Sequence, residues 1–185
     1  YASFDHFLES FRSSARKKTR RERRKIAEAG ISVRRTFANE LTPSQWDDFY
    51  ELYASSFYKR GRAPYFTRDF FTQITDTLGG EILLIWALRN DSAVAVSMFF
   101  VSAKVLYGRY WGCREFVDGL HFELCYYQGI DFCIANNIDR FDPGVQGEHK
   151  IARGFESATS RSSHWIRHPE FAAAIDNYLQ REATH

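Results

Sequence analysis

The sequence predicts an α+β domain in which helices flank a mixed central sheet. Three strand-like segments follow one another without a helix between them over residues 81–112, which is typical of antiparallel strands. A helix-like segment over 119–136 and a short apolar strand over 138–142 then complete a late β–α–β unit. With 185 residues and 44% apolar side chains, the chain is long enough to bury one substantial core.

The chain begins with a helix whose apolar side chains recur at helical spacing and stop after Ala15. Basic side chains replace them, and Gly30 is a typical residue for the end of a helix. We therefore expect residues 1–30 to form a basic N-terminal helix that packs on a domain of residues 31–185.

The remaining elements follow from alternation, helical spacing and turn residues. Thr42 precedes Pro43, which is the usual order of an N-cap and a first helical residue. The turn at 90–92 favours a hairpin between the first two of the three consecutive strands. The expected elements are strand 31–37, helices 42–58 and 67–78, strands 81–89, 93–103 and 104–112, helix 119–136, strand 138–142, a strand near 157–166 and helix 169–182.

Composition excludes several classes of protein. No apolar run approaches the roughly 20 residues of a membrane span. Three scattered cysteines argue against a disulfide scaffold and for a reducing, cytoplasmic compartment. The chain starts at Tyr1 and its only methionine is Met98. We therefore expect a piece of a longer protein, whose missing N-terminal half is a partner of this one.

Positive charge is concentrated near the N-terminus. Residues 12–25 hold nine basic side chains and one acid, a local charge of +8, so the rest of the chain carries −6. Like charges one helical turn apart repel by roughly 0.2–0.5 kcal/mol per pair, and folding gains nothing from that repulsion. A solvated tail and an interface with another domain are alternatives, but contact with a polyanion such as tRNA is favoured. The residues expected to bind it are Arg16, Lys17, Arg20, Arg21, Arg23 and Arg24.

The segment 142–155, DPGVQGEHKIARGF, is the main candidate for a functional loop. It follows a short strand, where scaffolds often carry their chemistry, and apolar residues stand at both of its ends. Its amide, carboxylate, imidazole, ammonium and guanidinium groups fall within eight residues. The candidates in this loop are Asp142, Gln146, Glu148, His149, Lys150 and Arg153.

Two neighbouring segments add candidate binding residues. Tyr107, Arg109 and Trp111 alternate along a strand and are expected to share one face, where arginine between aromatic rings suits a planar or anionic ligand. Glu123 and Tyr126 lie at the edge of the apolar side of the helix 119–136. The alternative for Arg109 is a structural ion pair.

Metal binding is the more specific alternative role for the histidines and cysteines. His121 and Cys125 lie one turn apart on the predicted helix, and His149 could join them. No further ligand stands at a spacing typical of zinc, so we predict no metal site.

Four motifs together resemble the FemAB-like family, labelled peptidoglycan biosynthesis or recognition, of the GNAT acyltransferase superfamily. They are the basic segment RKKTRRERRK followed by Gly30, the strand YGRYWGC, the helix HFELCYYQGI and the loop DPGVQGEHKIARGF. The resemblance implies a GNAT-like fold and a protein of two GNAT-like halves, of which this is the C-terminal one. It also implies transfer of an acyl or aminoacyl group to an amine.

One departure from the acetyl-CoA enzymes concerns the acyl donor. Their Gly-rich pyrophosphate turn is replaced here by GCREFVDGLHF, in which Glu115 and Asp118 occupy phosphate positions. This favours aminoacyl-tRNA over acetyl-CoA as the donor.

In that chemistry, Glu148 or His149 would take a proton, and Lys150 or Arg153 would stabilise negative charge. Ion pairing of Lys150 and Arg153 with Glu148 and Glu156 is the structural alternative. The alternative function is a non-catalytic module that recognises a peptidoglycan fragment or nucleic acid.

Overall fold

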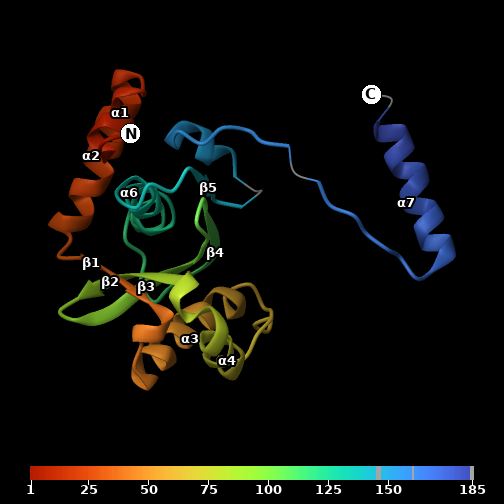
Figure 1. Cartoon of the computed structure of the whole chain (residues 1–185), viewed down its shortest axis with the longest axis horizontal. Coiled ribbons are helices and arrows are strands. Elements are labelled where there is room, and N and C mark those ends of the chain that lie inside the picture. The colour runs from red at the N-terminus through yellow and green to blue at the C-terminus, as the bar shows by residue number, and fades with distance from the viewer. Residues whose placement is uncertain (145–146, 160, 184–185) are drawn as a thin grey trace. The chain divides into compact units, whose positions relative to one another are not determined.

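The computed structural model describes residues 1–144, 147–159 and 161–183 (Figure 1). The chain divides into two compact units, Tyr1–Phe155 and Glu156–His185. The helices are α1 (Phe4–Glu9), α2 (Ser13–Glu28), α3 (Pro43–Tyr58), α4 (Arg68–Leu78), α5 (Leu120–Phe122), α6 (Gln128–Ala135) and α7 (Pro169–Glu182). The strands are β1 (Ser32–Phe37), β2 (Ile82–Arg89), β3 (Ser92–Val101), β4 (Val105–Cys113) and β5 (Arg140–Asp142).

The first unit is built on a five-stranded sheet in the order β1-β2-β3-β4-β5. The first four strands pair antiparallel, and β5 pairs parallel with β4. This is the predicted mixed sheet, and the predicted helices and strands between residues 31 and 113 form close to their expected bounds. Among the described residues, no helix is long and apolar enough to cross a membrane.

Helices cover both faces of the sheet, with α3 and α4 on one side and α1, α2 and α6 on the other (Figure 1). Successive residues of β2 alternate between the two cores, because neighbouring side chains of a strand point to opposite faces. Leu84 and Trp86 pack with α3 and α4, whereas Leu83 and Ile85 pack with the cluster that contains Phe132 of α6. Both faces of the sheet are therefore buried.

The expected single N-terminal helix is two helices, separated where Arg12 has an extended backbone (ψ 147°). Side-chain and backbone groups of Ser10 both donate to the Phe7 carbonyl and end α1. The break turns α1 so that Phe7 and Leu8 are buried against Ile130 of α6. In α2, Thr19 and Ile26 are the buried residues.

A π-helical turn, Glu123–Tyr127, joins α5 to α6 and will be called the π-turn. The sequence predicts one regular helix here, and the wider turn is not visible in it. Ser97, which is buried in β3, donates its hydroxyl to the Leu124 carbonyl at 3.0 Å. This explains a serine in an otherwise apolar strand, because buried carbonyl groups need a donor.

The alternation of β4 is interrupted, since its pairing with β3 shifts by one residue at Arg109. This is a β-bulge, which adds an unpaired residue to one strand. Leu106 and Trp111 are five residues apart, yet both pack into the cluster on the α6 side. The expectation that Tyr107, Arg109 and Trp111 share one face depends on unbroken alternation and does not hold.

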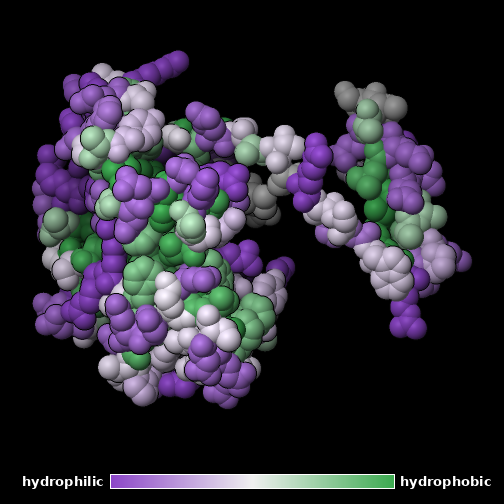
Figure 2. Space-filling view, in the orientation of Figure 1, coloured by the Kyte–Doolittle hydropathy of each residue, from purple (hydrophilic) through white to green (hydrophobic). Residues whose placement is uncertain are grey.

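In the second unit, the described residues between 156 and 167 form no strand, although a strand near 157–166 was predicted. This segment is rich in serine and offers little apolar surface to a sheet; Trp165 is 82% exposed. The predicted helix forms as α7, and none of its residues is buried. Apolar side chains lie along one side of it (Figure 2).

Candidate active site

The loop after β5 is fixed by its own lysine. The Lys150 ammonium donates to the carbonyl oxygens of Pro143 (2.9 Å) and Gly144 (2.8 Å). Asp142 accepts the backbone N–H of Gly144 at 2.9 Å. Lys150 is buried, which lowers its pKa, and it does not point at open solvent. Lys150 and Asp142 therefore make contacts that shape the loop, and their expected roles in catalysis and in substrate binding stay predictions.

Arg153 ends the 3₁₀ turn Glu148–Arg153 and is 4% exposed. Its guanidinium donates to the His149 carbonyl at 3.0 Å and forms an ion pair with Glu22 of α2 at 3.3 Å. The same group lies 3.3 Å from the ring centre of Phe122, a cation–π contact. Arg153 therefore holds the loop from inside the first unit.

His149 is exposed at the turn, and its Nε2 lies 2.9 Å from the hydroxyl of Tyr126. Its ring also packs against Phe122, with the two ring centres 5.7 Å apart. Burial, followed by the charges of Arg153 and Lys150, lowers the pKa of His149 below its usual value. Near pH 7 its imidazole is therefore neutral and can accept a proton.

Tyr126 is 5% exposed and comes from the π-turn. Burial raises the pKa of Tyr126 to about 12, so its hydroxyl keeps its proton at neutral pH. Phe155 covers the other side of the ring at 5.4 Å. The loop and the π-turn thus meet in one His149–Tyr126 pair. Glu148 is exposed beside it, and Gln146 lies outside the described residues.

A second histidine stands behind this pair. His121 has its Nδ1 3.4 Å from the Cys125 sulfur, and its ring meets the edge of Trp111 at 5.2 Å. Burial lowers the pKa of His121 to about 4 and raises the pKa of the Cys125 thiol. Both groups are then neutral at pH 7, which is the opposite of an activated thiolate. In the described ranges 1–144, 147–159 and 161–183, no three His, Cys, Asp or Glu side chains form a metal cluster.

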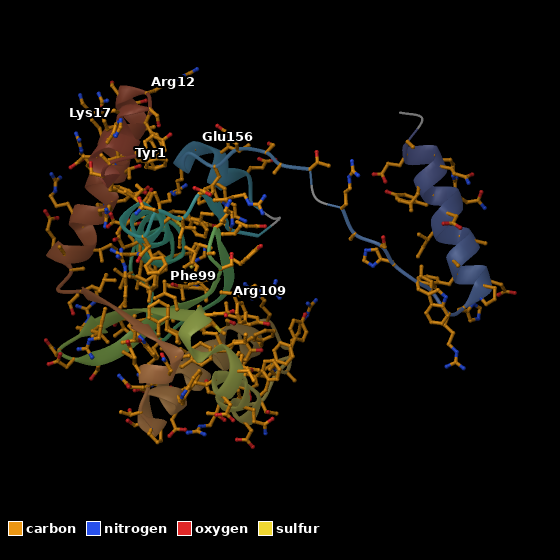
Figure 3. All side chains as sticks on the ribbon, viewed as in Figure 1. Tyr1, Arg12, Lys17, Phe99, Arg109 and Glu156 are labelled. Carbon is orange, nitrogen blue, oxygen red and sulfur yellow. The ribbon has the colours of Figure 1, made fainter. Side chains whose placement is uncertain are left out.

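Two predicted binding residues lie elsewhere. Glu123 is 4% exposed and accepts hydrogen bonds from Arg23 (3.2 Å) and Gln128 (2.7 Å), behind the π-turn. Arg109 projects from the bulge of β4 into solvent (Figure 3), and its described contact is with Tyr110 at 5.9 Å. Among the predicted binding residues, Tyr126 contacts His149 directly. Trp111 contacts the ring of His121, which lies behind that pair.

Helix α2 has an inner and an outer side. Arg23 is directed inward to Glu123 and Asp131, and Arg16 is partly buried. Lys17 points away from the first unit (Figure 3). Each exposed member of the predicted polyanion set has another member three or four residues away, and these residues will be called the basic stripe. They are Lys17, Arg20, Arg21 and Arg24.

Ion pairs on the basic stripe are exposed. Arg20 pairs with Asp5 at 2.9 Å and Arg24 with Glu28 at 3.2 Å, all with side chains more than half exposed. Exposed pairs contribute roughly 0–1 kcal/mol and open readily to another anion. Hydrophilic side chains also cover this side of the first unit in Figure 2.

Two residues that build the site, Glu22 and Phe122, are not among those predicted from the sequence. Glu22 is the one acid within the basic run, and that isolation was the available signal. The structure pairs it with Arg153 and with the hydroxyl of Tyr127. Phe122 gave no signal, because its position between Arg153 and His149 depends on the π-turn.

The segment after β4 does not fit a coenzyme A pyrophosphate. Glu115 pairs with Arg89 and Asp118 with Lys25, both at 2.9 Å, so two carboxylates stand in the stretch that leads to α5. Gly112 is needed for packing, because a Cβ there would lie 1.9 Å from the Leu52 carbonyl oxygen.

The sheet order, with helices on both faces, is the GNAT fold of acetyltransferases. The structure is similar to a possible acetyltransferase from Clostridium difficile 630, with a TM-score of 0.55 and 14% identity, covering 75% of this chain and 99% of that one. It is similar to an acetyltransferase from Trypanosoma brucei, with a TM-score of 0.53 and 12% identity over 74% of this chain and 99% of that one. A third similar structure is an aminoglycoside acetyltransferase from an uncultured soil metagenomic sample, with a TM-score of 0.52 and 12% identity over 76% and 97% of the two chains. At these identities the likeness establishes the fold alone.

The chain belongs to the FemAB-like family, described as peptidoglycan biosynthesis/recognition, whose model matches residues 1–185. That match gives no support to the expectation that the chain is specifically a C-terminal half. No curated protein sequence matches the chain.

Proposed function

We propose that this chain is an N-acyltransferase that passes an acyl or aminoacyl group to an amine, with His149 as the proton acceptor. The observation that supports this most is the exposed His149, held by Tyr126 at 2.9 Å on a loop that Lys150 and Arg153 fasten. A lowered pKa leaves this imidazole neutral at pH 7, as a general base requires.

In the proposed reaction, the amine attacks the acyl carbon of an aminoacyl ester. A C–N bond forms, the ester C–O bond breaks, and the proton of the amine is passed to the leaving hydroxyl. The His149–Tyr126 pair carries this proton. If Tyr126 donates to Nε2, then Nε2 is the base, and the amine proton reaches it through the Tyr126 hydroxyl, which passes its own proton to Nε2; if Nε2–H donates to Tyr126, the basic lone pair is on Nδ1. Glu148, which is exposed and precedes His149 in the chain, is proposed to bind the amine.

Aminoacyl-tRNA is the proposed donor and acetyl-CoA the less favoured one, because the segment after β4 carries acids where a pyrophosphate would need donors. The basic stripe supports a polyanionic donor. The family description supports an acceptor from peptidoglycan metabolism. The free thiols of Cys113, Cys125 and Cys133 support a cytoplasmic location.

The alternative is a module that recognises a peptidoglycan fragment or nucleic acid without catalysis. The internal contacts of Lys150 and Arg153 favour it, because neither cation is left to stabilise an oxyanion. The two proposals differ in whether His149 is needed for turnover or only for affinity.

The test is turnover of aminoacyl-tRNA and of acetyl-CoA with a peptidoglycan-precursor amine, for the parent protein and for His149→Ala and Glu148→Gln. His164→Ala is the matched control, since His164 is exposed in the second unit. We expect transfer from aminoacyl-tRNA that is lost in His149→Ala and kept in the control. Binding without transfer by the parent would favour recognition. Full activity of His149→Ala would remove the proposed base.

A polyanion on the basic stripe has its own signature. Binding should weaken as salt rises, with a log–log slope that grows with the number of phosphates neutralised. An affinity that is independent of salt would exclude the basic stripe from the donor site.

A further inference from the structure

The lone acid of the basic run, Glu22, does not face the basic stripe. Its side chain is 15% exposed and lies against the π-turn, where it accepts the Tyr127 hydroxyl and pairs with Arg153 at 3.3 Å. Lys18 on its own helix lies 3.9 Å away. One carboxylate of α2 therefore reaches the functional loop from a helix more than a hundred residues earlier in the sequence.

Arg153 has few alternatives to this carboxylate. It is 4% exposed, and its Nε is buried with no hydrogen-bond partner among the described residues. One terminal nitrogen is given to the His149 carbonyl and the other to Glu22, while the plane of the group lies on Phe122. Such a fork holds both partners in a fixed geometry, which a flexible ammonium does not.

The contacts thus form one chain from α2 to the proposed base. Glu22 holds Arg153, Arg153 holds the backbone of His149, and the His149 ring is then placed on Tyr126 and Phe122. Tyr126 and Tyr127 are neighbours in the π-turn. The same turn therefore places one hydroxyl on His149 and the next on Glu22.

We infer that Glu22 and Arg153 are positioning residues for His149, so that α2 orients the proposed base as well as presenting the basic stripe. This inference rests on the proposed function for its catalytic meaning, but the orientation of the ring can be measured without any substrate. It also changes the role of Arg153 from substrate binding to support of the base.

The experiment is a ¹⁵N NMR spectrum of the histidine rings in this chain, with His149 assigned from the spectrum of His149→Ala. Glu22→Gln removes the charge and keeps the shape. Glu28→Gln is the matched control, because it removes the same charge from the exposed pair with Arg24 on the same helix. Arg153→Lys keeps the charge and loses the fork.

We expect the parent and Glu28→Gln to show the ring shifts of one fixed His149 tautomer. Glu22→Gln and Arg153→Lys should move these shifts toward the tautomer average and reduce kcat by about tenfold to a hundredfold, with KM little changed. Unchanged His149 shifts in both variants, even with a lower melting temperature, would overturn the inference. If Glu22→Gln does not fold, Glu22→Asp replaces it with the same two outcomes.

Failure of the proposed function gives a different result. A His149→Ala protein that retains full turnover would remove the base, whatever the ring shifts of the other variants show. If the His149 shifts move in Glu22→Gln and Arg153→Lys but the parent protein shows no turnover, the positioning role of Glu22 and Arg153 stands and the proposed catalysis does not.

Discussion

Replacing Arg23 or Arg24 by alanine removes one positive charge from adjacent positions of α2. We nevertheless expect Arg23→Ala to affect mainly the stability of the fold and Arg24→Ala to affect mainly the binding of a polyanion. Arg23 donates to the buried Glu123 at 3.2 Å and to Asp131 at 3.3 Å, and its guanidinium lies 4.3 Å from the ring centre of Phe4. Arg24 pairs with Glu28 on the outside of the helix.

The magnitudes follow from burial. The Glu123 side chain is 5% exposed and the Arg23 side chain 26% exposed. Removing one partner of a buried pair destabilises by roughly 3–5 kcal/mol. Because Arg23 is partly exposed and Gln128 still donates to Glu123 at 2.7 Å, we expect about 2–3 kcal/mol for Arg23→Ala. Arg24→Ala breaks an exposed i, i+4 pair and should lose about 0.3–0.5 kcal/mol.

Urea unfolding measures the first difference and polyanion binding at two salt concentrations measures the second. Arg23→Ala should lower the free energy of unfolding and leave the salt slope of binding near the parent value. Arg24→Ala should lose only the small stability of its exposed pair, and it should reduce the log–log salt slope of polyanion binding by about the contribution of one phosphate. Equal stability losses in the two variants would refute the division of α2 into an inner and an outer side.

Three further results are expected. Gly112→Ala should lose about 3 kcal/mol in urea unfolding, because its Cβ would meet the backbone of Leu52; Gly80→Ala, with nothing within 4 Å, is the control, and similar losses would contradict the close packing. Since burial lowers the pKa of His121 to about 4, the unfolded state binds more protons than the folded state between that value and the ordinary one of about 6.5. Stability should therefore fall as pH is lowered through this window, by up to about 3 kcal/mol, and a His121→Gln variant that shows the same fall would argue against this group. For turnover, kcat/KM should rise with pH below about 6.5 as His149 loses its proton, and a fall of kcat/KM at low pH that persists unchanged in the residual activity of His149→Ala would argue against this base.

Much of the sheet could be predicted because its signals are local. The alternation over 81–112 and the Thr42–Pro43 helix start depend on neighbouring residues, and both appear in the structure. The strand near 157–166 could not be judged in this way, because a strand also needs a partner and apolar surface to bury. Likewise the break at Arg12 depends on how α1 packs on Ile130, which no local pattern records.

The composition of the loop 142–155 was enough to single it out as the candidate site. The roles of the individual residues in that loop could not be predicted from composition. The loop 142–155 was singled out by its dense polar chemistry, and His149 stands in it as an exposed group. Lys150 and Arg153 looked equally available, because sequence does not show which cation is directed inward. The different roles of Arg23 and Arg24 could not be predicted for the same reason. In a run of charged residues, the sequence does not show which of them face inward until the buried side of the helix is known.

The π-turn also has a consequence for how this protein tolerates insertions and deletions. A π-helical turn holds one residue more than an α-helical turn, so removing one residue from it would let α5 and α6 join as a regular α-helix with little change in the phase of α6. The local contacts would change instead: the Leu124 carbonyl would no longer be offered to Ser97 in the same way, and the two adjacent tyrosines would no longer serve His149 and Glu22 together. A single-residue deletion between 123 and 127 should thus leave the helix folded and disturb the site. The extra residue of this stretch serves the contacts of the π-turn more than the helix itself.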